Sequence, residues 1–234
     1  MCKKLKNLIL VLTQLLLSLS VYSQKDVTQF LNIPIDGYKS EMIKKLKDKG
    51  YKISSSKNDI LIGEFNGVSV NIHIATNNNK VWRLMITDVN TMNEQDIKIR
   101  FNNLCQQLQS NKKYISALVS DSSYMIQSNE NISYQILVNK KRYEAVYYQR
   151  PTNLSDNEVL SKEIKEKLLK KYTQEQLSNP TEEIVKSTIE EGFSYMLEKY
   201  SKKSVWFMIN EHFGKYYITM FYDNEYNRAN GEDL

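Results

Sequence analysis

Apolar and polar residues alternate along residues 68 to 75, and this pattern predicts a strand with one buried and one wet face. The apolar positions are Val68, Val70, Ile72 and Ile74. Asn66-Gly67 joins this segment to a strand predicted over residues 59 to 65, because both positions of a tight hairpin turn need positive φ. A third strand is predicted over residues 81 to 87. The sequence therefore predicts an antiparallel meander.

Helical periodicity is found on both sides of this meander. Residues 40 to 49 are expected to form a helix that ends at Gly50, with lysines in its last turn. A second helix is predicted over residues 93 to 110, where apolar residues recur at the 3.6-residue period. Its apolar stripe consists of Ile97, Phe101, Leu104, Cys105 and Leu108. We expect these five residues to lie in the core.

Two more hairpins are predicted further along the chain. The first pairs residues 132 to 138 with residues 143 to 149 around a turn at Asn139-Lys140-Lys141. The second pairs residues 205 to 209 with residues 215 to 222. Each follows a predicted helix, so the order of helix and hairpin occurs three times.

Two helices are predicted between these hairpins. Ser155, with Glu158 three residues later, has the pattern of a capping box that opens a helix to about residue 172. Thr181 is a suitable N-cap for a helix to residue 200. Gly192 inside that helix indicates close packing against another backbone, because glycine otherwise weakens a helix.

This order of elements predicts an α+β fold in which repeated units of a helix and an antiparallel meander pack helices on an antiparallel sheet. We expect residues 24 to 150 to form a helix-plus-meander domain of two units. Residues 151 to 234 are expected to add a helical pair and a C-terminal hairpin that pack with the first part.

The first 23 residues have the pattern of a secretory signal peptide. Three lysines precede an apolar run from Leu8 to Leu19, and small residues follow before Gln24. The run is shorter than the roughly 20 apolar residues that a spanning helix needs. We therefore expect cleavage before Gln24, export to the periplasm, the cell surface or the medium, and no membrane span afterwards.

Cleavage changes the charge and the cysteine content. The whole chain has 32 basic and 27 acidic residues, and loss of the three lysines leaves a net charge of +2. The remaining lysines alternate with acidic residues in helical segments, which is typical of solvated helix faces and not of a nucleic-acid binder. Only Cys105 remains, so the mature chain has no intramolecular disulfide and depends on its core for stability.

Several short segments resemble exported uncharacterised proteins of Bacteroides-type bacteria. These segments are Asn32-Ile33-Pro34-Ile35-Asp36-Gly37, Gly63-Glu64-Phe65-Asn66-Gly67, Asn77-Asn78-Asn79-Lys80-Val81-Trp82-Arg83 and Tyr222-Asp223-Asn224. That resemblance covers most of the mature chain and implies no activity. The order of elements also looks like the helix-plus-meander repeat of β-lactamase-inhibitor-protein-like and outer-membrane-assembly lipoprotein folds. This second resemblance implies a binding module.

The sequence offers little catalytic chemistry. Cys105 would need His73 or His212 beside it to act as a nucleophile, but its place on an apolar stripe predicts a buried, inert thiol. Asp223, Glu225 and Asn227 alternate as in a calcium loop, yet an arginine stands where that loop needs glycine. No phosphate loop, metal signature or cofactor motif is present in the sequence.

Aromatic residues are concentrated in the predicted strands and carry the functional hypothesis. If one sheet face is open, its aromatic side chains would form a patch suited to protein or glycan contact. The candidate binding residues are Tyr143, Tyr147, Trp206, Tyr217 and Phe221. We therefore expect an exported binding module for an envelope protein or glycan. The alternatives are a hydrolase of cell-envelope or other polysaccharides and a structural protein of envelope assembly.

Overall fold

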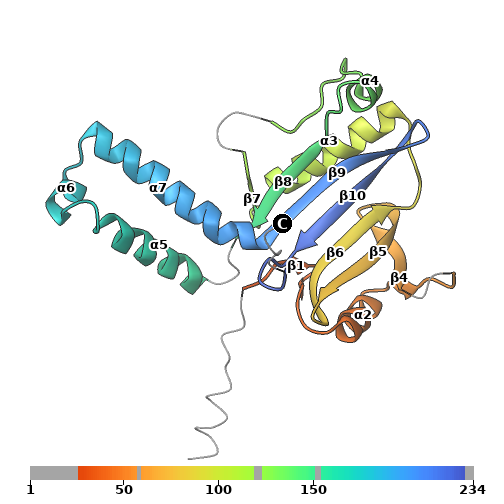
Figure 1. The fold of residues 1–234 in the computed structure, drawn as a ribbon, viewed down its shortest axis with the longest axis horizontal. Helices are drawn as coiled ribbons and strands as arrows, with labels where there is room; N and C mark the ends of the chain where they lie inside the picture. The colour runs from red at the N-terminus through yellow and green to blue at the C-terminus, as the bar shows by residue number, and fades with distance from the viewer. Residues whose placement is uncertain (1–25, 57–58, 119–122, 151–153, 230–234) are drawn as a thin grey trace, which may run out of the picture.

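A computed structural model describes residues 26–56, 59–118, 123–150 and 154–229. The described chain has an α+β fold, with an eight-stranded antiparallel sheet, a two-stranded sheet and helices (Figure 1). This confirms the predicted fold class. The expected signal peptide lies outside the described residues.

The first part of the chain forms one helix and a meander, as predicted. Its elements are β1 (Gln29–Phe30), β2 (Ile33–Pro34), α2 (Lys39–Asp48), β3 (Lys52–Ile53), β4 (Ile60–Phe65), β5 (Val68–Asn77) and β6 (Lys80–Asp88). Asn66 and Gly67 form the β4–β5 turn with positive φ values of 53° and 77°. The tight hairpin is therefore confirmed.

The second part forms another helix and meander, interrupted by helices. Its elements are α3 (Glu94–Ser110), β7 (Tyr114–Ser116), α4 (Ile132–Leu137), β8 (Glu144–Gln149), α5 (Leu154–Leu168), α6 (Gln174–Ser178), α7 (Glu182–Tyr200), β9 (Ser204–His212) and β10 (Lys215–Asp223). The strand order β3-β4-β5-β6-β10-β9-β8-β7 shows that each unit is a helix followed by four strands. The two units join where their last strands, β6 and β10, pair.

This topology changes the interpretation of the C-terminal part. The hairpin predicted as a third unit completes the second unit, because β9 and β10 lie between β8 and β6. Residues on both sides of position 150 thus share one sheet. The helices α5, α6 and α7 are an insertion between β8 and β9, and Figure 1 shows them projecting away from the sheet as an arm.

The strand predicted over residues 132 to 138 was wrong, because this segment forms α4. The side chain of Asn131 caps the helix by accepting a hydrogen bond from the backbone N–H of Tyr134 at 2.8 Å. Both edges of β8 are already paired, with β7 and β9, so the sheet has no place for another strand beside it.

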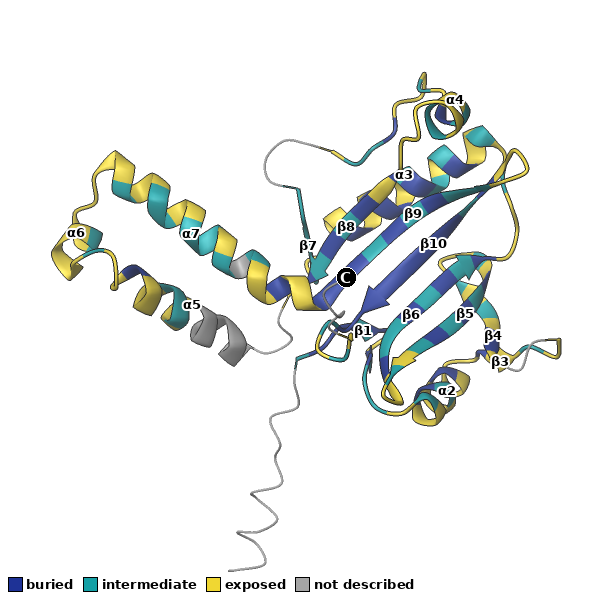
Figure 2. Ribbon diagram, viewed as in Figure 1, coloured by how far each residue is buried: buried dark blue, intermediate teal, exposed yellow. Residues whose placement is uncertain are grey.

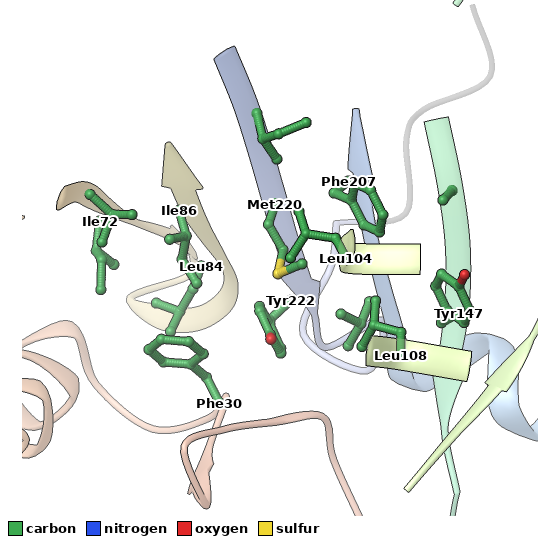
Figure 3. Close-up of a cluster of buried hydrophobic side chains, with 14 of the residues drawn as sticks. Phe30, Ile72, Leu84, Ile86, Leu104, Leu108, Tyr147, Phe207, Met220 and Tyr222 are labelled. Atoms are coloured by element: carbon green, nitrogen blue, oxygen red, sulfur yellow. The ribbon is translucent and has the colours of Figure 1, made fainter. Parts of the chain in front are cut away.

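The core lies between one face of the sheet and the helices α2 and α3. The predicted stripe of α3 is buried there, and Figure 3 shows Leu104 and Leu108 near the sheet side chains Met220, Phe207 and Tyr147. Phe30, from the lead-in before α2, packs against Tyr222 with ring centroids 5.0 Å apart. The helices of both units therefore cover the same face.

The arm formed by α5, α6 and α7 agrees with the predicted helices in part. Thr181 caps α7 as expected, since its hydroxyl accepts a hydrogen bond from the N–H of Ile184. The side chains of residues 154 to 160 lie outside the described part, so the capping box at Ser155 stays a prediction. The expected close backbone at Gly192 was wrong, because a Cβ there would meet the side chain of Ile164 at 3.8 Å.

Candidate binding surface

The sheet has a second face, and within the described residues no helix lies over it. In Figure 1 α3 lies behind β8 and β9, on the core side. Residues of a strand alternate between the two faces, so neighbours of core positions point to the open side. Tyr216 and Tyr222 belong to the core, whereas Tyr217 and Phe221 belong to the open face.

A row of mostly apolar side chains crosses the open face from strand to strand. Phe221 of β10 lies opposite Met85 of β6 on one side and Trp206 of β9 on the other. The row continues to His73 of β5 and to Val146 of β8. Directly opposed side chains in a sheet are close enough to contact one another. The row therefore forms a continuous surface across five strands.

A stack of aromatic rings and a guanidinium group stands at one end of this face. The rings of Trp206 and Phe221 are stacked with centroids 3.9 Å apart and an interplanar angle of 14°. The guanidinium carbon of Arg83 lies 5.0 Å from the Phe221 centroid and 4.3 Å from that of Trp82. Arg228 lies over the Trp82 ring at 5.9 Å. Each cation–π contact contributes on the order of 0.5 to 2 kcal/mol, depending on its exposure to water.

A buried carboxylate holds this stack in position. Asp223 accepts two hydrogen bonds from Arg83, Nε to Oδ1 and Nη2 to Oδ2, both at 2.6 Å. Its Oδ2 atom also accepts a hydrogen bond from the indole N–H of Trp206 at 2.9 Å. The side chain of Asp223 is 2% exposed, whereas that of Arg83 is 19% exposed. Because the pair joins β6 to β10, it also fastens the two units together.

The five predicted binding residues do not share one face. Trp206, Tyr217 and Phe221 lie on the open face, where the first two are half-buried and Phe221 is covered by its neighbours. Tyr143 and Tyr147 were wrongly assigned to the surface, because both are buried on the core side. Tyr147 lies in β8, which pairs it with the core residue Val205, and Tyr143 directly precedes that strand. The register of β8 therefore turns Tyr147 to the core side.

The sequence interpretation missed Arg83 and Asp223 as members of the surface. They are 140 positions apart, and only the pairing of β6 with β10 brings them together. The one signal in the sequence was Asp223, an aspartate at the end of a predicted buried strand, which indicates a basic partner. The sequence could not show which basic residue would pair with it.

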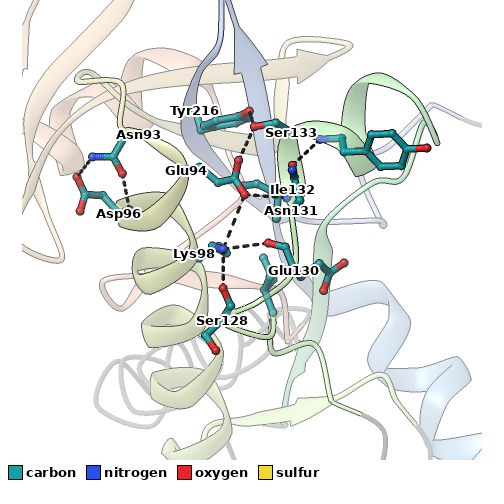
Figure 4. Close-up of polar contacts among 12 residues, drawn as sticks. Asn93, Glu94, Asp96, Lys98, Ser128, Glu130, Asn131, Ile132, Ser133 and Tyr216 are labelled. Atoms are coloured by element: carbon teal, nitrogen blue, oxygen red, sulfur yellow. Dashed lines mark hydrogen bonds and ion pairs between the residues drawn. The ribbon is translucent and has the colours of Figure 1, made fainter.

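A second polar cluster connects α3 to α4 (Figure 4). Glu94 of α3 accepts hydrogen bonds from the backbone N–H of Ile132, at 3.0 Å, and from the hydroxyl of Ser133. The Ser133 hydroxyl also lies 2.6 Å from that of Tyr216. Burial acts to raise the pKa of Glu94, but hydrogen bonds from Ser133 and Ile132, together with Lys98, lower it below its ordinary value. The cluster orients the first turn of α4 against α3.

The same cluster fixes the loop before α4. Lys98 donates to the carbonyl oxygens of Ser128 at 3.0 Å and Glu130 at 2.9 Å. The carboxylate of Glu130 accepts hydrogen bonds from Lys141 and from the hydroxyl of Tyr143, the latter at 2.5 Å, and these lower its pKa. All of these groups have partners within the chain, so we interpret the cluster as structural.

The arrangement of Cys105 and the histidines does not form a catalytic pair. Cys105 is buried on the core side, and burial raises the pKa of its thiol to about 11. His73 lies on the opposite face of the sheet, and His212 is exposed at the end of β9. In the described ranges, no three His, Cys, Asp or Glu side chains lie together as a metal site would require.

Comparison with known proteins did not identify a relative. No family model, curated protein or solved structure matches the chain. Among the helices of the described residues, none is long and apolar enough to cross a membrane.

Proposed function

We propose that this protein is an exported binding module without enzymatic activity, and that it holds a protein of the cell envelope on the open face of its sheet. The observation that carries the proposal is the row of His73, Met85, Phe221, Trp206 and Val146, over which no described helix packs. Open patches of apolar and aromatic side chains with a polar rim are typical of protein contacts.

The orientation of the rings favours a protein partner over a glycan. A sugar ring stacks on an aromatic side chain only where one face of that ring is free. Phe221 has Trp206 stacked on it and Arg83 over it, and Trp82 has Arg83 and Arg228 over its ring. These rings therefore already have a second ring or guanidinium groups over them. The flexible side chain of Met85, in the same row, suits the irregular surface of a protein.

The polar residues beside the row supply directional contacts. Thr87 and Thr219 lie opposite each other with their hydroxyl oxygens 3.3 Å apart, and Asn210 donates to Thr219 at 3.0 Å. Tyr217 lies next to them, opposite Asn210. A partner lying across the sheet would thus meet an apolar row beside a row of hydroxyl and amide groups.

The proposed export rests on the basic start and apolar run of the first 23 residues. It would place the open face where envelope proteins are the available partners. Mass spectrometry of the protein recovered from the envelope fraction tests this step. A first residue of Gln24 is expected, and an intact Met1 would overturn the proposed export.

Site-specific photo-crosslinking in the producing cells tests the binding surface. A photoreactive residue is placed at Met85 or Tyr217, both half-buried on the open face, and, as a matched control, at Tyr134, which is 53% exposed on α4. We expect a discrete, protease-sensitive adduct from the first two positions and none from the control. The same adduct from all three positions, or none from Met85 and Tyr217, would overturn the proposal. An adduct that resists protease but is lost on periodate oxidation would show a glycan partner instead.

A further inference from the structure

Two protruding segments at one end of the molecule expose apolar side chains. The first is α4 with its C-cap residue, where Tyr134, Leu137 and Val138 are 53%, 53% and 57% exposed. These positions, three and four residues apart, share one side of the helix. The second is the β9–β10 turn, at which Phe213 is 91% exposed. Exposed apolar residues that are grouped, unlike scattered ones, indicate a contact surface.

Hydrogen bonds hold these two segments at the same end. The hydroxyl of Ser133 in α4 lies 2.6 Å from that of Tyr216, three residues after Phe213. The N–H of Ile209 in β9 donates at 3.0 Å to the carbonyl oxygen of Tyr143, which follows the loop after α4. Figure 1 accordingly shows α4 and the β9–β10 turn at the end of the sheet that lies away from α2.

The β9–β10 turn has a phenylalanine at a position that suits other residues better. Both turn positions have positive φ, 50° at Phe213 and 72° at Gly214. The corresponding positions are Asn66-Gly67 in the β4–β5 turn and Asn78-Asn79 in the β5–β6 turn, and these residue types adopt positive φ readily. A bulky side chain adopts it only with strain, and Phe213 is not buried in compensation. Such strain indicates a role outside the fold.

Basic residues follow each of the apolar segments. The exposed basic residues are Lys140, Lys141 and Arg142 after α4, and Lys215 after the turn. The ion pair of Lys141 with Glu130 leaves the lysine side chain 45% exposed and the glutamate 20% exposed. The pair of Arg142 with Glu144 leaves these side chains 62% and 41% exposed. In both pairs the positive group is the outer one, so the surface that meets solvent is basic.

Three further acidic residues at this end face inward or away. Glu211 is half-buried, and its carboxylate accepts a hydrogen bond from the N–H of Gly214 at 2.6 Å. Glu94 is turned toward the start of α4, as described above. Asp96 is exposed, but it lies about 200° round α3 from Glu94 and lines a hollow beside Asn66. The exposed apolar side chains are therefore bordered by positive charge.

We propose that this end of the protein docks on the surface of a bilayer that contains anionic phospholipids. Phe213 and the exposed side of α4 enter the headgroup region, and the basic residues lie against the lipid charges. Burial of apolar side chains and attraction of basic ones to anionic lipid together give peripheral membrane binding. A protein partner would need pockets shaped to these protruding side chains, whereas a headgroup region accepts protrusions of any shape. The inference does not depend on the open sheet face and concerns another surface.

Co-sedimentation with lipid vesicles tests the inference. The chain used begins at Gln24, so that the apolar run of residues 8 to 19 cannot itself bind lipid, and every residue that the structure describes is kept. We expect binding to vesicles of equal parts phosphatidylglycerol and phosphatidylcholine. Binding to phosphatidylcholine alone should be weaker, and added salt should weaken binding to the anionic vesicles.

Phe213→Asn separates membrane contact from folding. The substitution should lower the partition coefficient by more than about tenfold, because a phenylalanine side chain is no longer removed from water. The melting temperature should stay the same or rise, since asparagine suits a positive φ. A purely structural role of Phe213 would give the opposite result, a lower melting temperature and unchanged binding.

Lys140→Gln combined with Lys215→Gln tests the basic border. Binding to the anionic vesicles should fall by about fivefold for each lysine. The matched control for charge is Lys45→Gln with Lys47→Gln on α2, at the other end of the sheet. The control for apolar surface is Ile189→Asn, a side chain 65% exposed on α7. Both controls should leave binding unchanged, and circular dichroism verifies that each variant is folded.

The absence of binding to the anionic vesicles at low salt would overturn the inference. Binding that Phe213→Asn leaves unchanged, or that the control substitutions reduce equally, would also overturn it. In the producing cells, a photoreactive residue at Tyr134 should label lipid. A discrete protein adduct at this position would show a protein partner at this end instead.

Discussion

Arg83→Met tests whether the buried ion pair fastens the two units of the fold. The substitution keeps the length of the side chain but removes the two hydrogen bonds of 2.6 Å to Asp223. Asp223 is 2% exposed and would keep only Trp206 and a distant Ser204, at 2.9 and 3.5 Å. Removing one member of a buried pair costs about 3–5 kcal/mol, because the remaining charge stays out of water.

The lost contacts of Arg83 with aromatic rings add to this cost. Taking about 0.5 kcal/mol for each of the rings of Trp82 and Phe221, we expect a total loss of about 4–6 kcal/mol. Urea denaturation, followed by tryptophan fluorescence and far-UV circular dichroism, measures the free energy of unfolding. Replacing both partners, Arg83→Met with Asp223→Leu, should recover most of the loss, because no buried charge then remains.

The matched control is Arg142→Met. Arg142 forms an ion pair with Glu144 at 2.9 Å, but their side chains are 62% and 41% exposed. Exposed pairs contribute about 0–1 kcal/mol, so this substitution should change little. If Arg83→Met proves no more costly than Arg142→Met, or the double substitution no better than the single one, the buried pair does not stabilise the junction.

Three further outcomes are expected from buried groups and from the topology. The thiol of Cys105, with a pKa of about 11, should resist iodoacetamide at pH 8 until urea unfolds the chain; rapid labelling of the native protein would contradict its burial. Burial raises the pKa values of Tyr147 and Tyr222, so the unfolded state loses these protons first as the pH rises above about 10. Stability should then fall by about 1.4 kcal/mol per pH unit for each ring, and stability that stays constant between pH 10 and 11 would refute this. Gly192→Ala should stabilise the arm by about 1 kcal/mol, as differential scanning calorimetry would show, since a Cβ there meets only Ile164 at 3.8 Å; a lower melting temperature would reveal a closer contact.

The two units depend on each other through the central strands. A fragment of residues 24 to 150 lacks β9 and β10, which leaves β6 and β8 each with an unpaired edge. It would also lose the core side chains Phe207, Ile218 and Met220. The insertion of the arm between β8 and β9 thus separates, along the chain, strands that form a single meander in space.

Local patterns in the sequence were sufficient to predict most of the elements. Asn66-Gly67 predicted its turn because few other residues adopt positive φ at both positions. The stripe of α3 predicted a buried face because its apolar residues recur at the period of the helix itself. Thr181 predicted the start of α7 through a hydrogen bond that spans only three residues. Alternation in β10 also predicted correctly that Tyr217 and Phe221 share a face.

Where competition between distant segments decides the outcome, local patterns were not sufficient. Residues 132 to 138 have the composition of a strand, but the edges of β8 are occupied and Glu94 binds the start of the segment as a helix. The register of β8 against β9, and not its aromatic content, buried Tyr147.

The sequence by itself determined most of the helices and strands, the tight turn, the buried stripe of α3 and the α+β class, because each depends on neighbours within a few residues. The tertiary structure decided the strand order, the place of the arm and the meeting of Arg83 with Asp223. Those features depend on which distant strands pair, and strand pairing is a property of the whole chain. The tertiary structure also decided which sheet face and which side of the arm are exposed, because exposure depends on where the other elements pack.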